Sequence, residues 1–301
     1  MSGKKRNGKK LLAAVTVLTI GLAVVAVHVK AAETSDIKLE GPLQQGGLLL
    51  GRVDPDTKLA LDGKPVRVAA DGQFVIGFDR DAKPHATLLA IDANNHKTTQ
   101  TLTIAQRKYA IQRVTGVPQN TVTPPPELLA RIEREAALVS RARTVDSDLR
   151  SFLDGFVWPL TGRISGVYGS QRVYNGTPGR PHFGVDVAAP VGTRVKAPAD
   201  ATVLLAEPDL FFSGGTLIMD HGYGVSSTFM HLSKLLVKTG DRIHVGQEVA
   251  EVGATGRASG PHLDWRINWF NVRIDPQLIA PPMPAQPVAT APTPTTTPAT
   301  P

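Results

Sequence analysis

The sequence predicts a mainly β protein in which one helix joins two β-rich regions. Two observations predict it. Short runs of β-forming residues, separated by turn residues, occupy 36–105 and again 155–280, and one apolar i, i+4 stripe lies between them. The 301 residues, of which 42% are hydrophobic, suffice for two domains with proper cores. The sequence has no cysteine, which excludes disulfides, cysteine-ligated metal sites and thiol nucleophiles.

The first 32 residues carry most of the positive charge. They contain six Lys and Arg and no acid, so subtracting these six from the formal net charge of +7 leaves +1 for the rest. This basic start and the apolar run 11–29 are typical of an export signal, either cleaved after Ala31 or kept as an inner-membrane anchor; we favour cleavage. The positive-inside rule places the chain after Lys30 outside the cytoplasm. No nucleic-acid partner is expected, because the remaining chain has no basic stripe interleaved with aromatic residues.

Residues 36–105 are predicted to form a small β-sandwich that serves as a spacer or recognition module. The turn pairs Asp62-Gly63 and Asp71-Gly72 lie between β-type runs, as in hairpins, because glycine tolerates a positive φ. The expected strands cover 48–51, 58–61, 66–68, 74–76, 86–91 and 99–104. His85 and His96 are isolated among polar residues and are expected in solvated loops.

Residues 124–150 are predicted to contain a connecting helix. Three prolines followed by Glu127 open it, because proline is tolerated in a first helical turn. Its apolar stripe, expected to pack on a neighbouring domain, consists of Leu128, Ile132, Ala136 and Val139. At the other end of the chain, residues 281–301 are mostly Pro, Thr and Ala, which cannot form a core, so a disordered tail is expected.

Residues 155–280 contain five of the eight histidines and all three tryptophans. His182 and Asp186 have a spacing that lets an imidazole and a carboxylate converge on one cation. His231 closes an apolar strand. In the next such run, strand alternation points His262 and Asp264 to one face and the apolar residues between them to the core. Each signal is weak alone, but together they predict a metal site built from histidine and carboxylate.

Nine motifs between residues 158 and 279 occur in an order found in one known family. They are SGVYGSQR at 165–172, HFGVD at 182–186, APADATV at 197–203, DHGYG at 220–224, MHLS at 230–233, GDRI at 240–243, VGQE at 245–248, GATG at 253–256 and SGPH at 259–262. This region resembles the lysostaphin-like (LytM-type) zinc endopeptidases, which cleave peptide bonds in bacterial peptidoglycan. The resemblance implies antiparallel sheets that form a groove open at one end, with the metal on its floor.

The resemblance also implies roles for individual residues. His182 and Asp186 become zinc ligands, and His231 and His262 become the pair that takes a proton from water and stabilises the oxyanion. The function implied is that of an exported metalloendopeptidase that hydrolyses peptidoglycan cross-links in the periplasm or cell envelope. Two further histidines lie outside the matched positions and are expected in loops or on the surface: His221 and His244.

The chain departs from the family at Asp264, where the family has the second histidine of an H-x-H motif as its third zinc ligand. Asp264 could bind zinc through oxygen. This would lower the net positive charge of the metal with its ligands and weaken the preference for zinc over Mn²⁺. Alternatively, it could pair with Arg266, two residues along the same strand face, in place of a metal. We favour the enzyme, with Asp264 as third ligand. The alternative is a catalytically degenerate module that binds peptidoglycan or activates another hydrolase.

Overall fold

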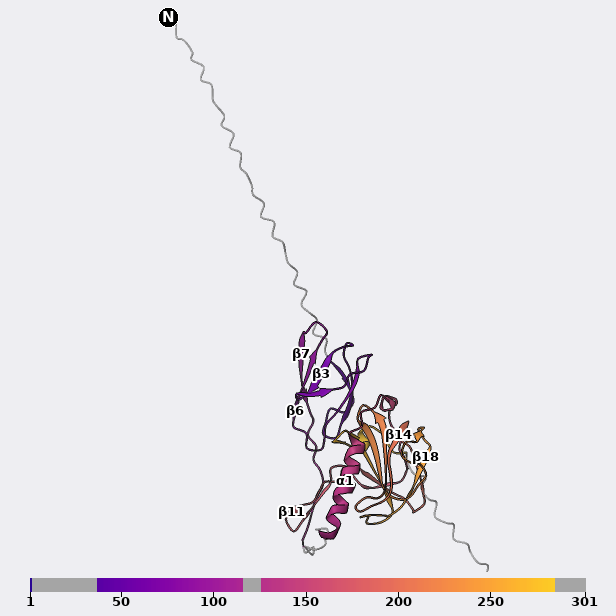
Figure 1. Ribbon diagram of the computed structural model, residues 1–301. Coiled ribbons are helices and arrows are strands. Elements are labelled where there is room, and N and C mark those ends of the chain that lie inside the picture. The colour runs from indigo at the N-terminus through magenta and orange to yellow at the C-terminus, as the bar shows by residue number, and fades with distance from the viewer. Residues whose placement is uncertain (2–36, 116–125, 285–301) are drawn as a thin grey trace, which may run out of the picture. The chain divides into compact units, whose positions relative to one another are not determined.

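The structure, a computed structural model, describes Met1, residues 37–115 and residues 126–284 (Figure 1). The expected export signal and residues 285–301 of the expected tail lie outside the described residues. Among the described helices, none is both long enough and apolar enough to cross a membrane. The predicted mainly β fold with a single longer helix is confirmed in the described part of the chain.

The N-terminal region forms two antiparallel sheets that share one core. One sheet has the order β1-β2-β5 and the other β4-β3-β6-β7. Their strands are β1 (Lys38–Glu40), β2 (Leu48–Arg52), β3 (Lys58–Leu61), β4 (Lys64–Val66), β5 (Gln73–Gly77), β6 (His85–Ile91) and β7 (Lys97–Thr103). Phe74 and Ile76 of β5 and Leu88 of β6 are at most 1% exposed and lie in the same apolar cluster. Alternate residues of both sheets therefore fill the centre of the predicted sandwich.

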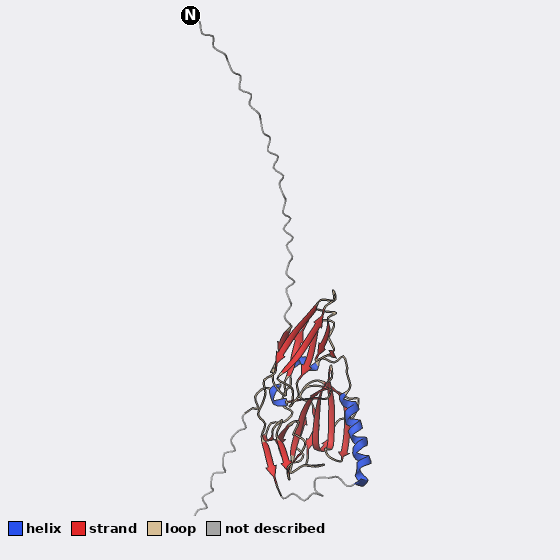
Figure 2. Ribbon diagram, turned by 90° about the vertical axis from the view of Figure 1, so that its left-hand side faces the viewer, coloured by secondary structure: helices blue, strands red, loops and turns tan. Residues whose placement is uncertain are grey.

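The C-terminal region is built on a sheet with the order β17-β14-β15-β16-β19-β12-β9, in which all neighbours are antiparallel (Figure 2). Its strands, including the three that pair off this path, are β9 (Arg163–Gly166), β12 (Val185–Ala188), β13 (Arg194–Lys196), β14 (Ala201–Leu210), β15 (Gly214–Gly222), β16 (Val225–Leu235), β17 (Arg242–Ile243), β18 (Glu248–Val252), β19 (His262–Trp269) and β20 (Val272–Ile274). Leu263, Trp265 and Ile267 are fully buried, so the core face predicted for β19 is confirmed.

A small fourth sheet joins the chain before the helix to the chain after it. β8 (Ile111–Val114) pairs in parallel with β10 (Gln171–Tyr174), which pairs with β11 (Thr177–Pro178). The part of the chain that the structure describes also contains three short 3₁₀ turns: η2 (Pro126–Leu128), η3 (Ser151–Asp154) and η4 (Pro276–Leu278).

Helix α1 (Leu129–Arg143) lies along β14 and β15 (Figures 1 and 2). Leu138, Val139 and Ala142 pack in a cluster that includes Ile218 of β15. The expected stripe is therefore only partly right, since Ala136 is exposed. Polar contacts hold the first half of the helix instead: Glu135 accepts a hydrogen bond of 2.7 Å from the backbone N–H of Phe211, and so the sheet side of this half need not be apolar.

A buried ion pair ties the segment after the sandwich to the C-terminal segment. Arg107 donates to Oδ2 of Asp275 at 2.8 Å, and the Asp275 side chain is 1% exposed. We expect Arg107→Met to lower the free energy of unfolding, because it leaves a buried carboxylate without its cation. The loss should fall towards the lower end of about 3–5 kcal/mol, since Arg107 is itself partly exposed.

Urea unfolding of Arg107→Met and of the unaltered protein measures this loss of unfolding free energy. Arg52→Met is the matched control, because Arg52 is exposed and forms no ion pair among the described residues. Equal midpoints for Arg107→Met and Arg52→Met would show that the pair adds nothing to stability.

Candidate active site

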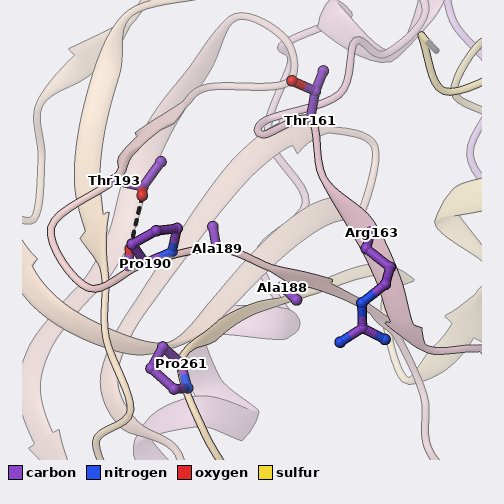
Figure 3. A pocket seen from close by; sticks show the side chains of 7 residues that line it. All are labelled: Thr161, Arg163, Ala188, Ala189, Pro190, Thr193 and Pro261. Carbon is purple, nitrogen blue, oxygen red and sulfur yellow. Dashed lines mark hydrogen bonds between the residues drawn. The ribbon is translucent and has the colours of Figure 1, made fainter. Parts of the chain in front are cut away.

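A pocket lies beside the beginning of β19 (Figure 3). It is lined by Thr161, Arg163, Ala188, Ala189, Pro190, Thr193 and Pro261. Pro261 precedes His262, and Ala188 lies directly opposite His262 in the β12–β19 register. The lining contains neither histidine nor carboxylate, so the chemistry of this region must come from the side chains next to the pocket.

Two aspartates face each other on neighbouring strands. The register of β12 and β19 places Asp186 directly opposite Asp264. Directly opposite residues of an antiparallel pair lie on the same face, with Cβ atoms about 4.5–5.5 Å apart. Asp264 is 2% exposed and Asp186 is half-buried. Two carboxylates in this position repel each other unless a cation compensates them.

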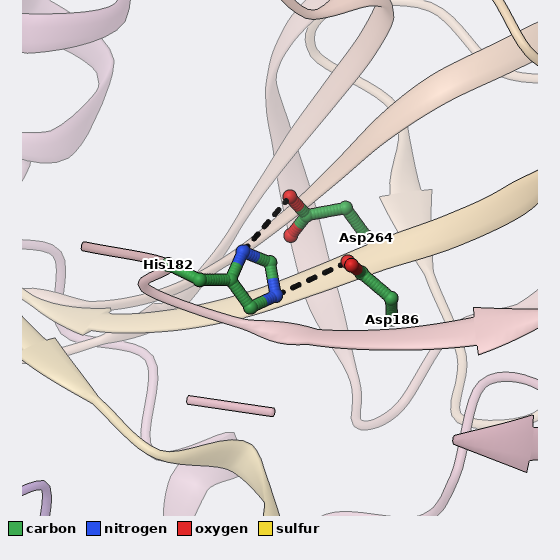
Figure 4. A group of neighbouring side chains, drawn as sticks. All are labelled: His182, Asp186 and Asp264. Atoms are coloured by element: carbon green, nitrogen blue, oxygen red, sulfur yellow. Dashed lines mark ion pairs between the residues drawn. The ribbon is translucent and has the colours of Figure 1, made fainter. Parts of the chain in front are cut away.

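His182 lies between these two aspartates (Figure 4). Its Nε2 is 3.2 Å from Oδ1 of Asp186, and its Nδ1 is 4.0 Å from Oδ2 of Asp264. Backbone hydrogen bonds with Gly169 and Ser170 fix the chain at His182, just before β12. One ligand atom from each of the three side chains lies within 4.8 Å of the others. The structure thus brings together the three residues for which the sequence predicts metal binding.

A one-residue bulge in β16 presents His231. Between Phe229 and Leu232, β16 advances three residues while β15 advances two. His231 lies in this bulge with φ 63°, a conformation uncommon for residues other than glycine. β16 pairs with β19 as far as Met230 and with β18 from Leu232, so His231 lies where the sheet divides. Bulges redirect side chains and recur beside active sites.

His231 and His262 lie side by side, with ring centroids 4.8 Å apart. Nδ1 of His231 donates to the carbonyl of Thr255 (2.8 Å), and Nδ1 of His262 to that of Gly260 (2.7 Å). Because a carbonyl only accepts, Nδ1 carries a proton in both rings and Nε2 is left to face the site. Nε2 of His262 is 3.8 Å from Oδ1 of Asp186. Burial lowers the pKa of His231, so this ring is neutral near pH 7.

Asp264 forms a bidentate ion pair with Arg266. Nε of Arg266 donates to Oδ1 at 2.9 Å, and one terminal nitrogen donates to Oδ2 at 2.6 Å. Burial works to raise the pKa of Asp264, but the guanidinium of Arg266 overrides it and holds that pKa below its ordinary value. The pairing of Asp264 with Arg266, which the sequence offered as the alternative to metal binding, is therefore present. It does not exclude a metal, because carboxylate oxygens have about four lone-pair positions in all.

Two glycines of the sequence motifs leave room for the acidic side chains. A Cβ atom on Gly184 would lie 2.6 Å from Oδ1 of Asp264, and one on Gly166 would lie 2.1 Å from Oδ2 of Asp186. Neither glycine has a positive φ in this structure. Their role is therefore to permit close approach rather than to form a turn.

The expectation that His221 lies in a loop or on the surface is wrong. His221 is fully buried in β15, where Nδ1 donates to the carbonyl of Asp200 and Nε2 accepts from the hydroxyl of Ser227. Burial lowers its pKa to about 4, so the ring is a neutral part of the core. His244 is exposed, as expected. The sequence misplaced His221 because its partners lie outside β15: the Asp200 carbonyl precedes β14, and the Ser227 hydroxyl is in β16.

Comparison with known proteins identifies the family. The family model described as peptidase family M23 matches residues 180–276. A crystal structure described as an M23 peptidase of Pseudomonas aeruginosa superposes with a TM-score of 0.61 at 31% identity, over 78% of this chain and 93% of that one. The chain belongs to peptidase family M23. The resemblance to LytM-type enzymes is thereby confirmed.

Two curated relatives of this M23 chain are the peptidoglycan DD-endopeptidases ShyB and ShyA of Vibrio cholerae. They are 32% identical over 135 residues and 35% identical over 106 residues, which is 44% and 35% of this chain. The matched segments make up 28% and 24% of those proteins, so this chain matches only about a quarter of their length.

The donor set of this M23 protein fits the metal that a metallopeptidase family implies. Nε2 of His182 and Oδ1 of Asp186 are buried, face each other at 3.2 Å, and have no hydrogen-bond partner in the described part of the chain. Two ligand atoms of a tetrahedral zinc ion are about 3.3 Å apart when each bond is about 2.0–2.1 Å long. Asp264 supplies a third oxygen to the group.

Two arginines to which no sequence motif points interact electrostatically with Asp264. Arg143 ends α1 and is 9% exposed. Arg273 lies on β20, where it is directly opposite Asn268 of β19. Neither belongs to a local motif, and Arg143 is more than a hundred residues from Asp264 in the chain, so only the fold brings them near.

Proposed function

We propose that this protein is an exported zinc endopeptidase that hydrolyses peptide cross-links of bacterial peptidoglycan. The observation that carries the proposal is the pair of buried, facing atoms Nε2 of His182 and Oδ1 of Asp186, next to the two histidines His231 and His262. Neither atom has a hydrogen-bond partner among the described residues, which leaves both available to bind a metal. The similarity to proteins named peptidoglycan DD-endopeptidases supports the substrate, and the basic and apolar N-terminus supports export.

His182, Asp186 and Asp264 would hold the ion. Arg266 changes the charge balance expected from the sequence, because Asp264 and Arg266 together carry no net charge, as a neutral histidine does. The ligand set with Arg266 then has a net charge of −1, the same as a His-Asp-His set. Arg266 therefore offsets the loss of metal acidity that a second carboxylate would cause. Oxygen ligands leave Mn²⁺ as a weaker alternative.

Zinc, when bound, would polarise the scissile carbonyl and make a water acidic enough to attack near neutral pH. His231 is the base in this proposal, because its ring is neutral and its Nε2 can accept the proton of the attacking water. His262, held by Gly260 through Nδ1, directs Nε2 towards the site. When this nitrogen also carries a proton, it can donate a hydrogen bond to the negatively charged carbonyl oxygen. The backbone contacts of both rings fix their orientation before substrate binds.

Metal analysis combined with digestion of purified sacculi tests the proposal. We expect about one zinc ion per chain and release of soluble peptides, with both lost after chelation and restored by added zinc. A metal-free protein that releases nothing from sacculi at micromolar concentration, with zinc supplied, would overturn it.

The bidentate Asp264–Arg266 pair favours a second candidate, a module that binds peptidoglycan or activates another hydrolase without cleaving. In that case the guanidinium replaces the metal as the partner of Asp264. The same sacculi decide between the two, because this candidate predicts sedimentation of the protein with the sacculi, no bound zinc and no released peptide.

A further inference from the structure

Four arginines lie near one another beside Asp264, because the charges of three of them and of Asp264 act on the fourth, Arg143; the other three are Arg180, Arg266 and Arg273. Of these four arginines, only Arg266 forms an ion pair with a carboxylate among the described residues. Arg273 lies over the ring of Phe183, with its guanidinium carbon 5.6 Å from the ring centroid. Asp264 is the acid whose charge acts on both Arg143 and Arg273, and Arg266 already neutralises it. This group of side chains therefore has an excess of positive charge.

Arg143 reaches this cluster from the end of α1. The neighbouring residue Ala142 packs in the same apolar cluster as Ile218 of β15. Ile218 lies directly opposite Thr228 of β16, and Thr228 lies directly opposite Arg266 of β19. The end of α1 thus lies over the face of the sheet that carries Asp264 and Arg266. Burial, then the positive charges of Arg273 and Arg266, lower the pKa of Arg143 well below its ordinary value.

Several polar atoms on this face have no partner. Nε of Arg143 is buried without a hydrogen bond among the described residues, and so are the hydroxyls of Ser226 and Thr228. Thr228 and Ser226 alternate with core residues along β16 and lie opposite Arg266 and Asn268. A buried guanidinium that lacks an anion is strongly unfavourable. All of these groups can donate hydrogen bonds, so the partner they suit is an acceptor with negative charge.

We propose that Arg143, Arg180 and Arg273 form a subsite that binds a free carboxylate of the peptide substrate. The inference rests on the proposed function, because it takes the substrate to be a peptide. A planar guanidinium matches a carboxylate through two parallel hydrogen bonds, and several such groups on one face select an acidic peptide over a neutral one. The subsite fixes the peptide on the same face as His182, Asp186 and Asp264.

A matched pair of cross-linked peptides tests the subsite with the unaltered full chain. The two peptides are identical except that the free carboxylates of one are converted to carboxamides. We expect the KM of the amidated peptide to be at least about tenfold higher, as for the loss of a charge-assisted hydrogen bond, with kcat changed less than about twofold. Equal KM values would overturn the subsite.

Binding of the same peptides to chelator-treated protein, measured by calorimetry, separates the two proposals. If the untreated protein cleaves neither peptide but the chelator-treated protein binds the acidic one at least tenfold more tightly, the hydrolase proposal fails and the subsite stands. If both are cleaved and bind with equal affinity, the subsite fails and the hydrolase stands.

Single substitutions test whether the arginines cause the preference for the acidic peptide. Arg143→Gln and Arg273→Gln should each reduce the preference for the acidic peptide by about tenfold. Arg134→Gln should keep the full preference, because Arg134 is on the same helix but exposed. Thermal unfolding shows whether each variant is folded, and Arg273→Gln serves if Arg143→Gln is not. A folded Arg273→Gln that keeps the full preference would contradict the assignment.

Discussion

Replacing His231 by asparagine is expected to lower kcat on wall peptides by about 10²–10⁴-fold, the range for loss of a general base. Asparagine suits the test because it tolerates the positive φ of 63° at this position. Its amide can also donate to the carbonyl of Thr255, the bond that Nδ1 of His231 now makes at 2.8 Å. What asparagine cannot do is accept a proton from water, so the variant removes the base and leaves the bulge in place.

Zinc content distinguishes this role from a structural one. His231 is not among the three grouped ligands, so His231→Asn should bind as much zinc as the original protein. The control is His244→Asn, the same substitution at an exposed histidine, which should leave kcat and zinc content unchanged. A kcat for His231→Asn within about twofold of the original would rule out His231 as the base.

Much of the fold follows from local pattern. Each of the six β-type runs of the N-terminal region overlaps one of the strands β2 to β7, because alternation and turn residues act over a few positions. In β19 the same alternation placed Asp264 and Arg266 on one face, and the structure has them in contact. Local pattern failed for Ala136, since the hydrogen bond between Glu135 and the Phe211 backbone depends on a segment 76 residues away in the chain.

The geometry of the site depends on pairings that local pattern does not define. The sequence names Asp186 and Asp264, but only the β12–β19 register sets them opposite each other. It names His231, but not the bulge that turns this side chain at the division of the sheet. It gives no sign of Arg143, whose place depends on how α1 packs on β15. Register, bulges and helix packing are properties of the assembled sheet.

The largest effect on stability is expected from Arg266→Met. Without the guanidinium, Asp264 is a buried carboxylate with 3% of its side chain exposed, directly opposite Asp186. Removing one partner of such a pair costs about 3–5 kcal/mol of unfolding free energy. Urea unfolding of the metal-free proteins measures it, with Arg242→Met as the control, because Arg242 is exposed and has no ion pair among the described residues. An unchanged midpoint for Arg266→Met would show that the Asp264 charge does not need this partner.

The zinc affinity of Arg266→Met then shows whether Asp264 is a metal ligand. If Asp264 is a ligand, the metal replaces the lost guanidinium, so Arg266→Met should bind zinc about tenfold more tightly, a gain of about 1.4 kcal/mol, and zinc should restore part of its stability. Removing a cation could also favour zinc through space, without ligation. In that case the gain would persist in the Asp264→Asn background, whereas ligation by Asp264 requires it to vanish in Asp264→Asn/Arg266→Met. Zinc affinity that does not rise in Arg266→Met would instead make Arg266 the true partner of Asp264 and favour the module that binds peptidoglycan without cleaving it.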